Sequence, residues 1–307
     1  MRVKKKKSTV DSQKIAFYFV LGIASLLFVS FVFRAIILVS KSKFDGHHRF
    51  TIQVSKSGQK EEALISLEPS SRMLSVLHLP EGPAVNPVSR FLEVPIDGHV
   101  ILTSESQDRY LVGLLKLETD IGGKDVSLIL AKLILQYNQL KTDLTIMDIV
   151  RFAWFSKGVH KNMVKFVAVS KSLTESSIDR ISSSFFPDTD LQKENATIAV
   201  VNATGVSGLG NRLARFISNM GGTVVSVSTG KSDEEDSKII KRTKKSYTFS
   251  KLLQVTGFRE AEIITPTPVP PDSLSLIPKE ESIETQDSFV SDIIVVIGKK
   301  SLSKFVF

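Results

Sequence analysis

The sequence contains no cysteine among its 307 residues. A disulfide framework, thiol catalysis and thiolate metal sites are therefore excluded, while the cellular compartment stays open. The five histidines show no metal-type spacing apart from the adjacent pair His47-His48, which we expect at the surface. Neither a Gly-x-Ser-x-Gly elbow nor a His-Glu-x-x-His pair occurs in the chain. We therefore predict no catalytic residue, no metal site and no cofactor.

Basic charge is scarce outside the first few residues. The net charge is +8, of which residues 1–14 carry +5 and the rest of the chain only +3. Nucleic-acid-binding proteins usually spread their basic residues over a folded face. Because the excess here lies in a short tail beside an apolar run, we predict no nucleic-acid partner.

That apolar run, Ile15–Phe33, is nineteen residues without a charge. As a helix it is about 28 Å long, close to the thickness of a hydrocarbon core. Arg34 can extend its head group to the interface, so we predict a transmembrane helix over residues 15–39 and the lipid bilayer as a partner. The lysines of residues 1–14 predict a cytoplasmic N-terminus and an extracytoplasmic body at the cell membrane. A cleaved signal peptide is the alternative, although Leu38-Val39-Ser40 is a poor cleavage site.

Residues 50–187 read as an α/β domain that is strand-rich first and helical later. We expect strands at Phe50–Val54, Ala63–Leu67, Met73–Leu79, His99–Leu102 and Val164–Val169, with a hairpin at Glu68–Ser71. We expect a first helix over Asp125–Leu140. A second helix should run from a capping box at Thr145–Asp148 to Gly158, with Ile146, Ile149, Val150 and Ala153 on one face. A third should run from another capping box at Ser172–Glu175 to Pro187. Polar residues Asp188–Asn195 are the predicted domain boundary.

Residues 196–300 alternate strands and helices. The predicted order is strand Ala196–Asn202, helix Leu209–Met220, strands Thr223–Ser228 and Lys238–Thr243, helix Tyr247–Thr256, and strands Glu262–Thr265 and Asp292–Gly298. This order predicts a small βαββαββ sandwich, and proline-rich residues 265–287 predict a disordered insertion. The predicted fold class is thus α/β, with one transmembrane helix followed by two mixed α/β domains.

The turn between the first strand and helix of this sandwich is the candidate binding site. Its residues are Asn202, Thr204, Gly205, Ser207 and Gly208. The free N–H groups and dipole of the following helix suit an anion or a sugar. The alternative is that the glycines only permit a tight turn, with Thr204 or Ser207 capping the helix. The glycine spacing matches neither the dinucleotide fingerprint nor the P-loop.

Two other short patterns have plain alternatives. The basic run Lys238–Lys245 could contact an anionic polymer, or it could be a solvated strand edge that lysines keep from aggregating. The sequences Asn195-Ala-Thr197 and Asn202-Ala-Thr204 fit a glycosylation sequon, a pattern that recurs by chance.

Residues 196–300 resemble the C-terminal domain that follows the catalytic module in LytR–CpsA–Psr proteins of bacterial cell envelopes. The resemblance is carried by Val200–Leu209, Leu213-Ala214, Gly221–Val227 and Asp292–Gly298. One departure is Asn202-Ala203-Thr204, where the family usually has Asn-Gly-Thr.

Residues 50–187 resemble a degenerate form of that catalytic module, through the hairpin Ala63–Pro80. The resemblance implies a Pro-Arg-Asp turn whose arginine holds the pyrophosphate of a lipid-linked polymer, with aspartates on a metal. This chain has Pro80-Glu81-Gly82 instead, so Glu81 repels the anion that the arginine would bind. Glu61 or Glu62 stands near an expected aspartate position.

These observations predict a non-catalytic, membrane-anchored envelope protein. Its C-terminal domain would bind peptidoglycan, a wall glycopolymer or another envelope protein. The alternative is a phosphotransferase that attaches lipid-pyrophosphate-linked glycopolymers to peptidoglycan. The historical naming of the family adds a transcription regulator, but the membrane span would separate its body from DNA.

Overall fold

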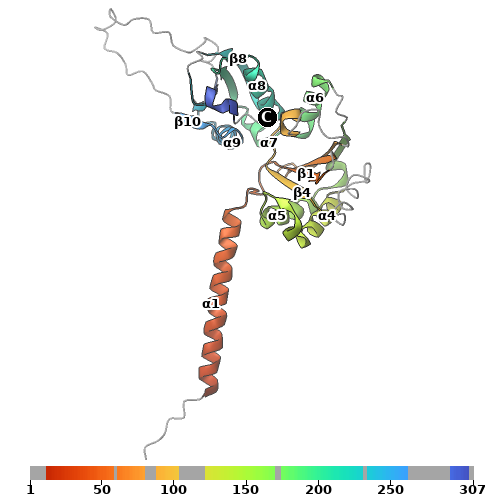
Figure 1. The fold of residues 1–307 in the computed structure, drawn as a ribbon, viewed down its shortest axis with the longest axis vertical. Coiled ribbons are helices and arrows are strands. Elements are labelled where there is room, and N and C mark those ends of the chain that lie inside the picture. Colours follow the sequence, from red (N-terminus) through yellow and green to blue (C-terminus); the bar gives the residue numbers. More distant parts are fainter. Residues whose placement is uncertain are drawn as a thin grey trace, which may run out of the picture.

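The computed structural model describes residues 12–58, 61–79, 88–103, 122–169, 174–230, 234–261 and 291–303. The chain is a mixed α/β protein in which one long N-terminal helix precedes two separate sheets, each with its own helices (Figure 1). The predicted fold class is therefore confirmed.

Helix α1 (Ser12–Ser40) stands away from the rest of the protein (Figure 1). Its 29 residues make a rod of about 44 Å, longer than the ~30 Å hydrocarbon core of a bilayer. The apolar side chains of its span are not buried inside the protein, so α1 is not a core helix. It is long and apolar enough to cross a membrane, and the predicted segment 15–39 lies within it.

The first sheet has six strands in the order β5-β4-β1-β2-β3-β6. They are β1 (Phe50–Lys56), β2 (Glu62–Glu68), β3 (Met73–Leu79), β4 (Gly98–Leu102), β5 (Lys141–Thr142) and β6 (Val164–Ala168). Strands β1, β2 and β3 form an antiparallel meander, and β4 and β6 run parallel to β1 and β3 at its two sides. The predicted hairpin turn lies between β2 and β3, where Arg72 takes a positive φ of 51°.

Helices cover both faces of this sheet. On one face lie α4 (Gly123–Leu135) and α5 (Ile146–Lys157), followed along the chain by the short turns η1 (Tyr137–Gln139) and η2 (Lys161–Met163). On the other face lie α2 (Val88–Leu92) and α6 (Glu175–Phe185). The strands alternate their side chains between two apolar cores, which explains why β2 and β3 are buried almost throughout.

Three details of the helices differ from the sequence prediction. The helix predicted to reach Leu140 ends at Leu135 and continues as η1. The capping box of Thr145 and Asp148 is confirmed, but Val150 is exposed, because the buried stripe runs through Ile149, Phe152, Ala153 and Ser156. Helix α6 begins after Thr174, whose side chain makes no capping bond, and the predicted cap Ser172 lies outside the described residues.

The second sheet has five strands in the order β10-β9-β11-β7-β8. Its elements are β7 (Thr197–Asn202), α8 (Leu209–Asn219), β8 (Thr223–Thr229), β9 (Lys238–Lys241), α9 (Ser246–Thr256), β10 (Arg259–Ala261), β11 (Ile293–Ile297) and the turn η5 (Lys299–Ser303). The βαββαββ order is as predicted. Strand β7 runs parallel to both β8 and β11, while β9 is antiparallel to β11. Helices α8 and α9 pack over one apolar face.

The predicted boundary between the two units contains a helix, which was not predicted from the sequence. Residues Asp188–Asn195 contain α7 (Thr189–Glu194), which buries Leu191 against the second core. The Asp188 carboxylate accepts hydrogen bonds from the N–H groups of Asp190 and Leu191, and Asn195 ends the helix in a left-handed conformation. A polar stretch thus forms a helix because its own ends cap it. The division of the chain at this point stays a prediction.

Two predictions for the C-terminal part, the strand at Glu262–Thr265 and the insertion at 265–287, lie outside the described residues. The structure adds a short strand before them, β10 at Arg259–Ala261. The alternative that Lys238–Lys245 forms a sheet edge is wrong, because β9 pairs with β10 on one side and β11 on the other. Its lysines contact the domain itself: Lys238 Nζ lies 2.8 Å from a Glu234 oxygen, and Lys241 Nζ lies over the Phe249 ring.

The two units are joined by a polar contact that we call the Glu93 latch, formed by Glu93, Asp179, Arg212, Arg215 and Asn219. Glu93 is a buried non-glycine residue with a φ of 49°. Its carboxylate lies 3.3 Å from Arg212 Nε and 3.2 Å from Arg215 Nε. Arg215 also donates to Asp179 of α6 at 2.9 Å, and Asn219 donates to the carbonyl of Glu93. Helix α8 is thereby tied to α2 and α6.

Candidate functional site

The predicted site lies where β7 ends and α8 begins. Asn202 turns its side chain back on the loop: its Oδ1 accepts from the Thr204 hydroxyl at 2.7 Å, and its Nδ2 donates to the Val206 carbonyl at 2.8 Å. The Thr204 hydroxyl in turn accepts from the Val206 N–H at 3.0 Å. These bonds occupy the polar atoms of Asn202 and Thr204, so both residues shape the turn.

The start of α8 has no side-chain cap. The cap residue is Gly208, with a φ of 85° and no side-chain hydrogen bond. The expectation that Thr204 or Ser207 caps this helix is therefore wrong, because Thr204 is buried in the turn and Gly208 intervenes after Ser207. Gly205 also has a positive φ of 77°. Two glycines at positive φ let the chain reverse and enter the helix within a few residues.

The turn forms one wall of a surface hollow of about 430 Å³, within the ~300–1,000 Å³ that ligand sites occupy. Four of the five predicted residues line it, namely Asn202, Gly205, Ser207 and Gly208, and Thr204 does not. The remaining lining residues are Val206, Gly210, Asn211, Val227, Ser228 and Thr229. The hollow thus lies at the carboxyl ends of the parallel strands β7 and β8, the edge at which open α/β sheets bind ligands.

Helix α8 lies close to the sheet at the bottom of the hollow. A Cβ added at Gly210 would lie 3.0 Å from Val227 and 3.2 Å from the Asn202 side chain. A larger residue would therefore push the helix away from β7 and β8. None of the residues that line the hollow is charged. Hydroxyl and amide groups, with the exposed Val206 and Val227 beside them, offer hydrogen bonds and apolar contact of the kind that a neutral sugar needs.

Three polar residues of the lining were not predicted from the sequence, namely Asn211, Ser228 and Thr229. A signal for the last two was available, because parallel neighbouring strands bring their carboxyl ends to one edge. Asn202 pairs with Thr229 in that register. The sequence alone did not establish that β7 and β8 are adjacent and parallel.

The acidic positions of the first unit form no assembled cluster in the part of the chain that the structure describes. Glu61 lies 3.0 Å from His78 Nε2 at the end of β3, and Glu62 accepts from Gln53 Nε2 at 3.2 Å. Burial raises the pKa of the Glu62 carboxyl, against the effect of that hydrogen bond. The described residues contain no group of three or more histidine, aspartate or glutamate side chains placed to hold a metal. Glu81 lies outside the described residues.

The pair His47-His48, predicted to lie at the surface, divides between the surface and the junction of the two units. His47 is exposed as expected, and His48 is partly buried with an ion pair to Asp45. The His48 ring stacks on Tyr247 of α9, with 4.7 Å between the ring centroids. The predicted surface role therefore holds for His47 alone.

Comparisons with known proteins agree with the C-terminal resemblance. Residues 195–300 match the LytR_C family, described as LytR cell envelope-related transcriptional attenuator. No curated protein matches the chain.

Solved structures with some likeness include the Lin1025 protein from Listeria innocua, with 14% identity over 45% of this chain and 96% of that one, and a TM-score of 0.32. The putative transcriptional factor Lmo1026 from Listeria monocytogenes has 11% identity over 45% of this chain and 95% of that one, and a TM-score of 0.33. B. subtilis TagT has 10% identity over 46% of this chain and 91% of that one, and a TM-score of 0.32. Residues 195–300 of the chain thus match the LytR_C family.

Proposed function

We propose that the chain is a membrane-anchored, extracytoplasmic envelope protein that binds cell-wall glycan without catalysing a reaction. The observation that carries the proposal is the neutral hollow at the end of β7 and β8, inside a domain of a cell envelope-related family. Helix α1, long and apolar enough to span a bilayer, supports the anchoring.

The absence of charge in the hollow favours glycan over an anionic group. Phosphate sites commonly add arginine or lysine to the N–H groups of a helix start. This hollow presents Ser207, Asn211, Ser228 and Thr229 instead. Sugars offer many hydroxyl groups and one apolar ring face, so hydroxyl and amide partners beside Val206 and Val227 match both parts.

The charge of one residue in the first unit also supports a binding role over catalysis. Residues 50–187 resemble a catalytic module that needs an arginine to hold its anionic substrate. By that resemblance Glu81 occupies the position of the arginine, and a carboxylate there would repel a lipid pyrophosphate. The phosphotransferase alternative would be restored if the full-length protein turned over a lipid-pyrophosphate-linked glycopolymer in the presence of a divalent cation.

The test is retention of the full-length protein, held in detergent micelles, on isolated peptidoglycan with its wall polymer attached or removed. We expect retention on both preparations and little loss at high salt, since neutral contacts are not screened. Asn211→Trp should abolish retention, because Asn211 is exposed and the indole would fill the hollow.

Val225→Trp is the matched control, since Val225 is exposed on β8 outside the hollow, and it should bind like the unchanged protein. Retention only when the wall polymer is attached would reassign the ligand to that polymer. No retention on either preparation at low salt would remove the proposal.

A further inference from the structure

Helices α4 and α5 expose large apolar side chains that the proposed function does not use. Trp154, the one tryptophan of the chain, is 74% exposed. Leu135 is 87% exposed and Leu128 61%, and Val150 and Phe155 are exposed as well. We call these five residues the α4–α5 face. Single exposed leucines are ordinary, but a group of large apolar residues on adjacent helices marks an interaction site.

The spacing of these residues places them on one side of the body. Leu128 and Leu135 are seven residues apart, two helical turns, and Val150 and Trp154 are four apart. Both helices pack on the same face of the first sheet and on each other. Their buried residues, such as Leu130 in α4, face that sheet. The exposed stripes therefore both point away from the sheet, in the same general direction.

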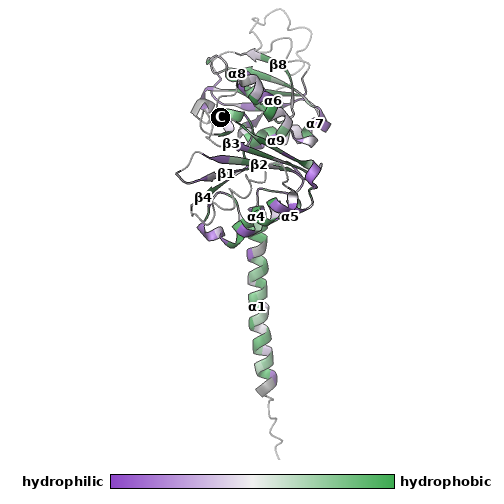
Figure 2. Ribbon diagram, turned by 90° about the vertical axis from the view of Figure 1, so that its right-hand side faces the viewer, coloured by the Kyte–Doolittle hydropathy of each residue, from purple (hydrophilic) through white to green (hydrophobic). Residues whose placement is uncertain are grey.

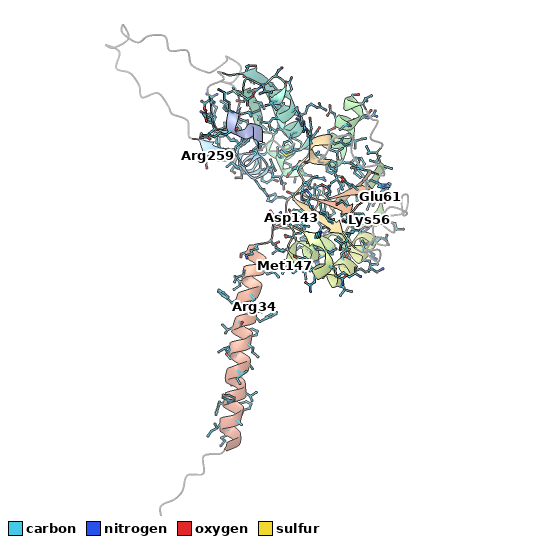
Figure 3. The ribbon with its side chains drawn as sticks, in the orientation of Figure 1. Arg34, Lys56, Glu61, Asp143, Met147 and Arg259 are labelled. Carbon is cyan, nitrogen blue, oxygen red and sulfur yellow. The ribbon has the colours of Figure 1, made fainter. Side chains whose placement is uncertain are left out.

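That direction is toward the end of the molecule from which α1 leaves. In Figures 1 and 2, which are turned by 90°, α4 and α5 lie at the end of the body beside α1, and the strand β8 lies at the opposite end. Met147 of α5 lies close to the end of α1 in Figure 3. The α4–α5 face is therefore the part of the body nearest to a membrane that α1 crosses.

The segment that follows α1 is fixed to α5. Phe44 is buried, with its ring 5.9 Å from that of Phe152 and 5.7 Å from that of Phe155 between centroids. The Asp148 carboxylate accepts from the Ser42 hydroxyl at 2.7 Å and from the Phe44 N–H at 2.8 Å. Since α1 ends at Ser40, only a few residues separate the bilayer surface from α5, a reach of roughly 14 Å when extended.

Charge around the face suits a lipid surface. Residues 122–163 contain six lysine or arginine residues against three aspartates, and one of these, Asp148, is buried. The exposed basic residues of the two helices and the turn after them are Lys124, Lys132, Lys157 and Lys161. Tryptophan beside leucine and lysine is the composition of segments that lie in the headgroup region of a bilayer. Lysines near such a surface attract anionic lipids.

We propose that the α4–α5 face docks onto the surface of the membrane that α1 crosses, with Trp154, Leu128 and Leu135 at the boundary between headgroups and acyl chains. The proposal rests on the membrane anchoring in the proposed function. Docking holds the first unit flat against the lipid. It directs the LytR_C domain, with its hollow, away from the membrane.

Trp154 itself reports on this contact. The full-length protein is reconstituted into vesicles of phosphatidylcholine and phosphatidylglycerol that contain lipid brominated close to the carbonyl end or close to the chain terminus. We expect blue-shifted Trp154 emission, and stronger quenching by the shallow bromines than by the deep ones. Trp154→Phe combined with Val225→Trp, which moves the tryptophan to exposed β8, should give red-shifted emission that neither lipid quenches.

The lysines give a second, charge-specific readout. Lys124→Glu with Lys157→Glu, both at exposed positions, should reduce the quenching of Trp154 in vesicles that contain phosphatidylglycerol. Quenching that is equal for the two tryptophan positions would overturn the docking. A blue shift without bromine quenching would assign the face to a second copy of the chain, and would also overturn it.

Alkaline carbonate extraction of the same vesicles separates the two proposals. Protein that resists extraction while Trp154 stays unquenched retains the anchoring and refutes the docking. If carbonate instead extracts the protein from the vesicles, the anchoring is refuted.

Discussion

Asp148 is the residue on which the connection between anchor and body depends. One carboxylate oxygen accepts from the Thr145 N–H and hydroxyl and so begins α5, while the other accepts from Ser42 and Phe44. Burial raises the pKa of this carboxyl, but hydrogen bonds from Phe44, Ser42 and Thr145 outweigh burial and hold it below the ordinary value. A carboxylate of this kind stabilises the fold only while it is ionised.

The sign of the pH dependence follows from that lowered pKa. The unfolded chain binds the proton more readily than the folded protein, so the stability from Asp148 is present above the ordinary carboxyl pKa of about 4 and is lost as the pH falls through the folded value. Asp148→Ala should lower the free energy of unfolding by about 1–3 kcal/mol at neutral pH. It should also flatten the acid limb of the stability profile.

Urea unfolding followed by Trp154 emission at several pH values measures both effects. Asp236→Ala is the matched control, because the Asp236 ion pair with Arg259 is largely exposed and should contribute only ~0–1 kcal/mol. Equal acid limbs for Asp148→Ala and the unchanged protein would contradict the assignment.

Part of the lining of the hollow could be predicted from the sequence. Four predicted turn residues, Asn202, Gly205, Ser207 and Gly208, line the hollow, and they could be singled out because a strand, a turn with glycines and a helix start are local patterns. The role of Asn202 was not predictable, because an amide that bonds its own loop has the same sequence as one that binds a ligand. Asn211 was not predicted, because it lies within the first turn of the helix and not in the glycine-containing loop before it.

At the scale of elements, the Glu93 latch fixes α8 against α2 and α6. Burial raises the pKa of Glu93, and Arg215 and Arg212 oppose that effect. Removing Arg215 leaves Glu93 with one partner fewer and Asp179 without the bond at 2.9 Å. The cost is concentrated at the junction, because the cores of the two units do not include these side chains.

Arg215→Ala should therefore loosen the junction and leave each core intact. Hydrogen exchange on the full-length protein should show faster exchange in α6 and α8, with β7 and β2 unchanged. Lys193→Ala is the control, since its pair with Asp190 lies within α7, and it should leave exchange in α6 and α8 unchanged. Faster exchange across both sheets would indicate global destabilisation instead of a local latch.

Most elements were predictable because their signals are local. The capping box of Thr145 and the apolar runs at β7 and β11 placed those elements within a residue or two. The exceptions depended on tertiary contacts. Helix α7 buries only Leu191, too little for a periodic signal, and β10 has three residues, whose strand form depends on pairing with β9. The pairing of β9 on both sides required the topology of the whole sheet.

At the scale of the whole molecule, the chain forms three levels along one axis: α1, the first sheet with its helices, and the LytR_C domain (Figure 1). The first unit lies between a candidate membrane span and the domain that carries the hollow. A second cavity of about 380 Å³ lies at the junction, where Lys43 after α1, Asp97 and His99 of the first unit meet Gln254 and Val255 of α9. The position of the hollow relative to the membrane thus depends on two contacts. The Glu93 latch joins the two units, and Phe44 and Asp148 join the segment after α1 to the first unit.

The same arrangement predicts a fixed topology, and the lack of cysteine makes it testable. A single cysteine can be introduced into the N-terminal tail as Ser8→Cys, or onto exposed β8 as Val225→Cys. Because the lysines of residues 1–14 favour the cytoplasmic side, a membrane-impermeant maleimide should label Val225→Cys in intact cells. It should label Ser8→Cys only after lysis. The reverse pattern would place the hollow in the cytoplasm, where it meets no wall glycan, and would reject both the orientation and the glycan ligand.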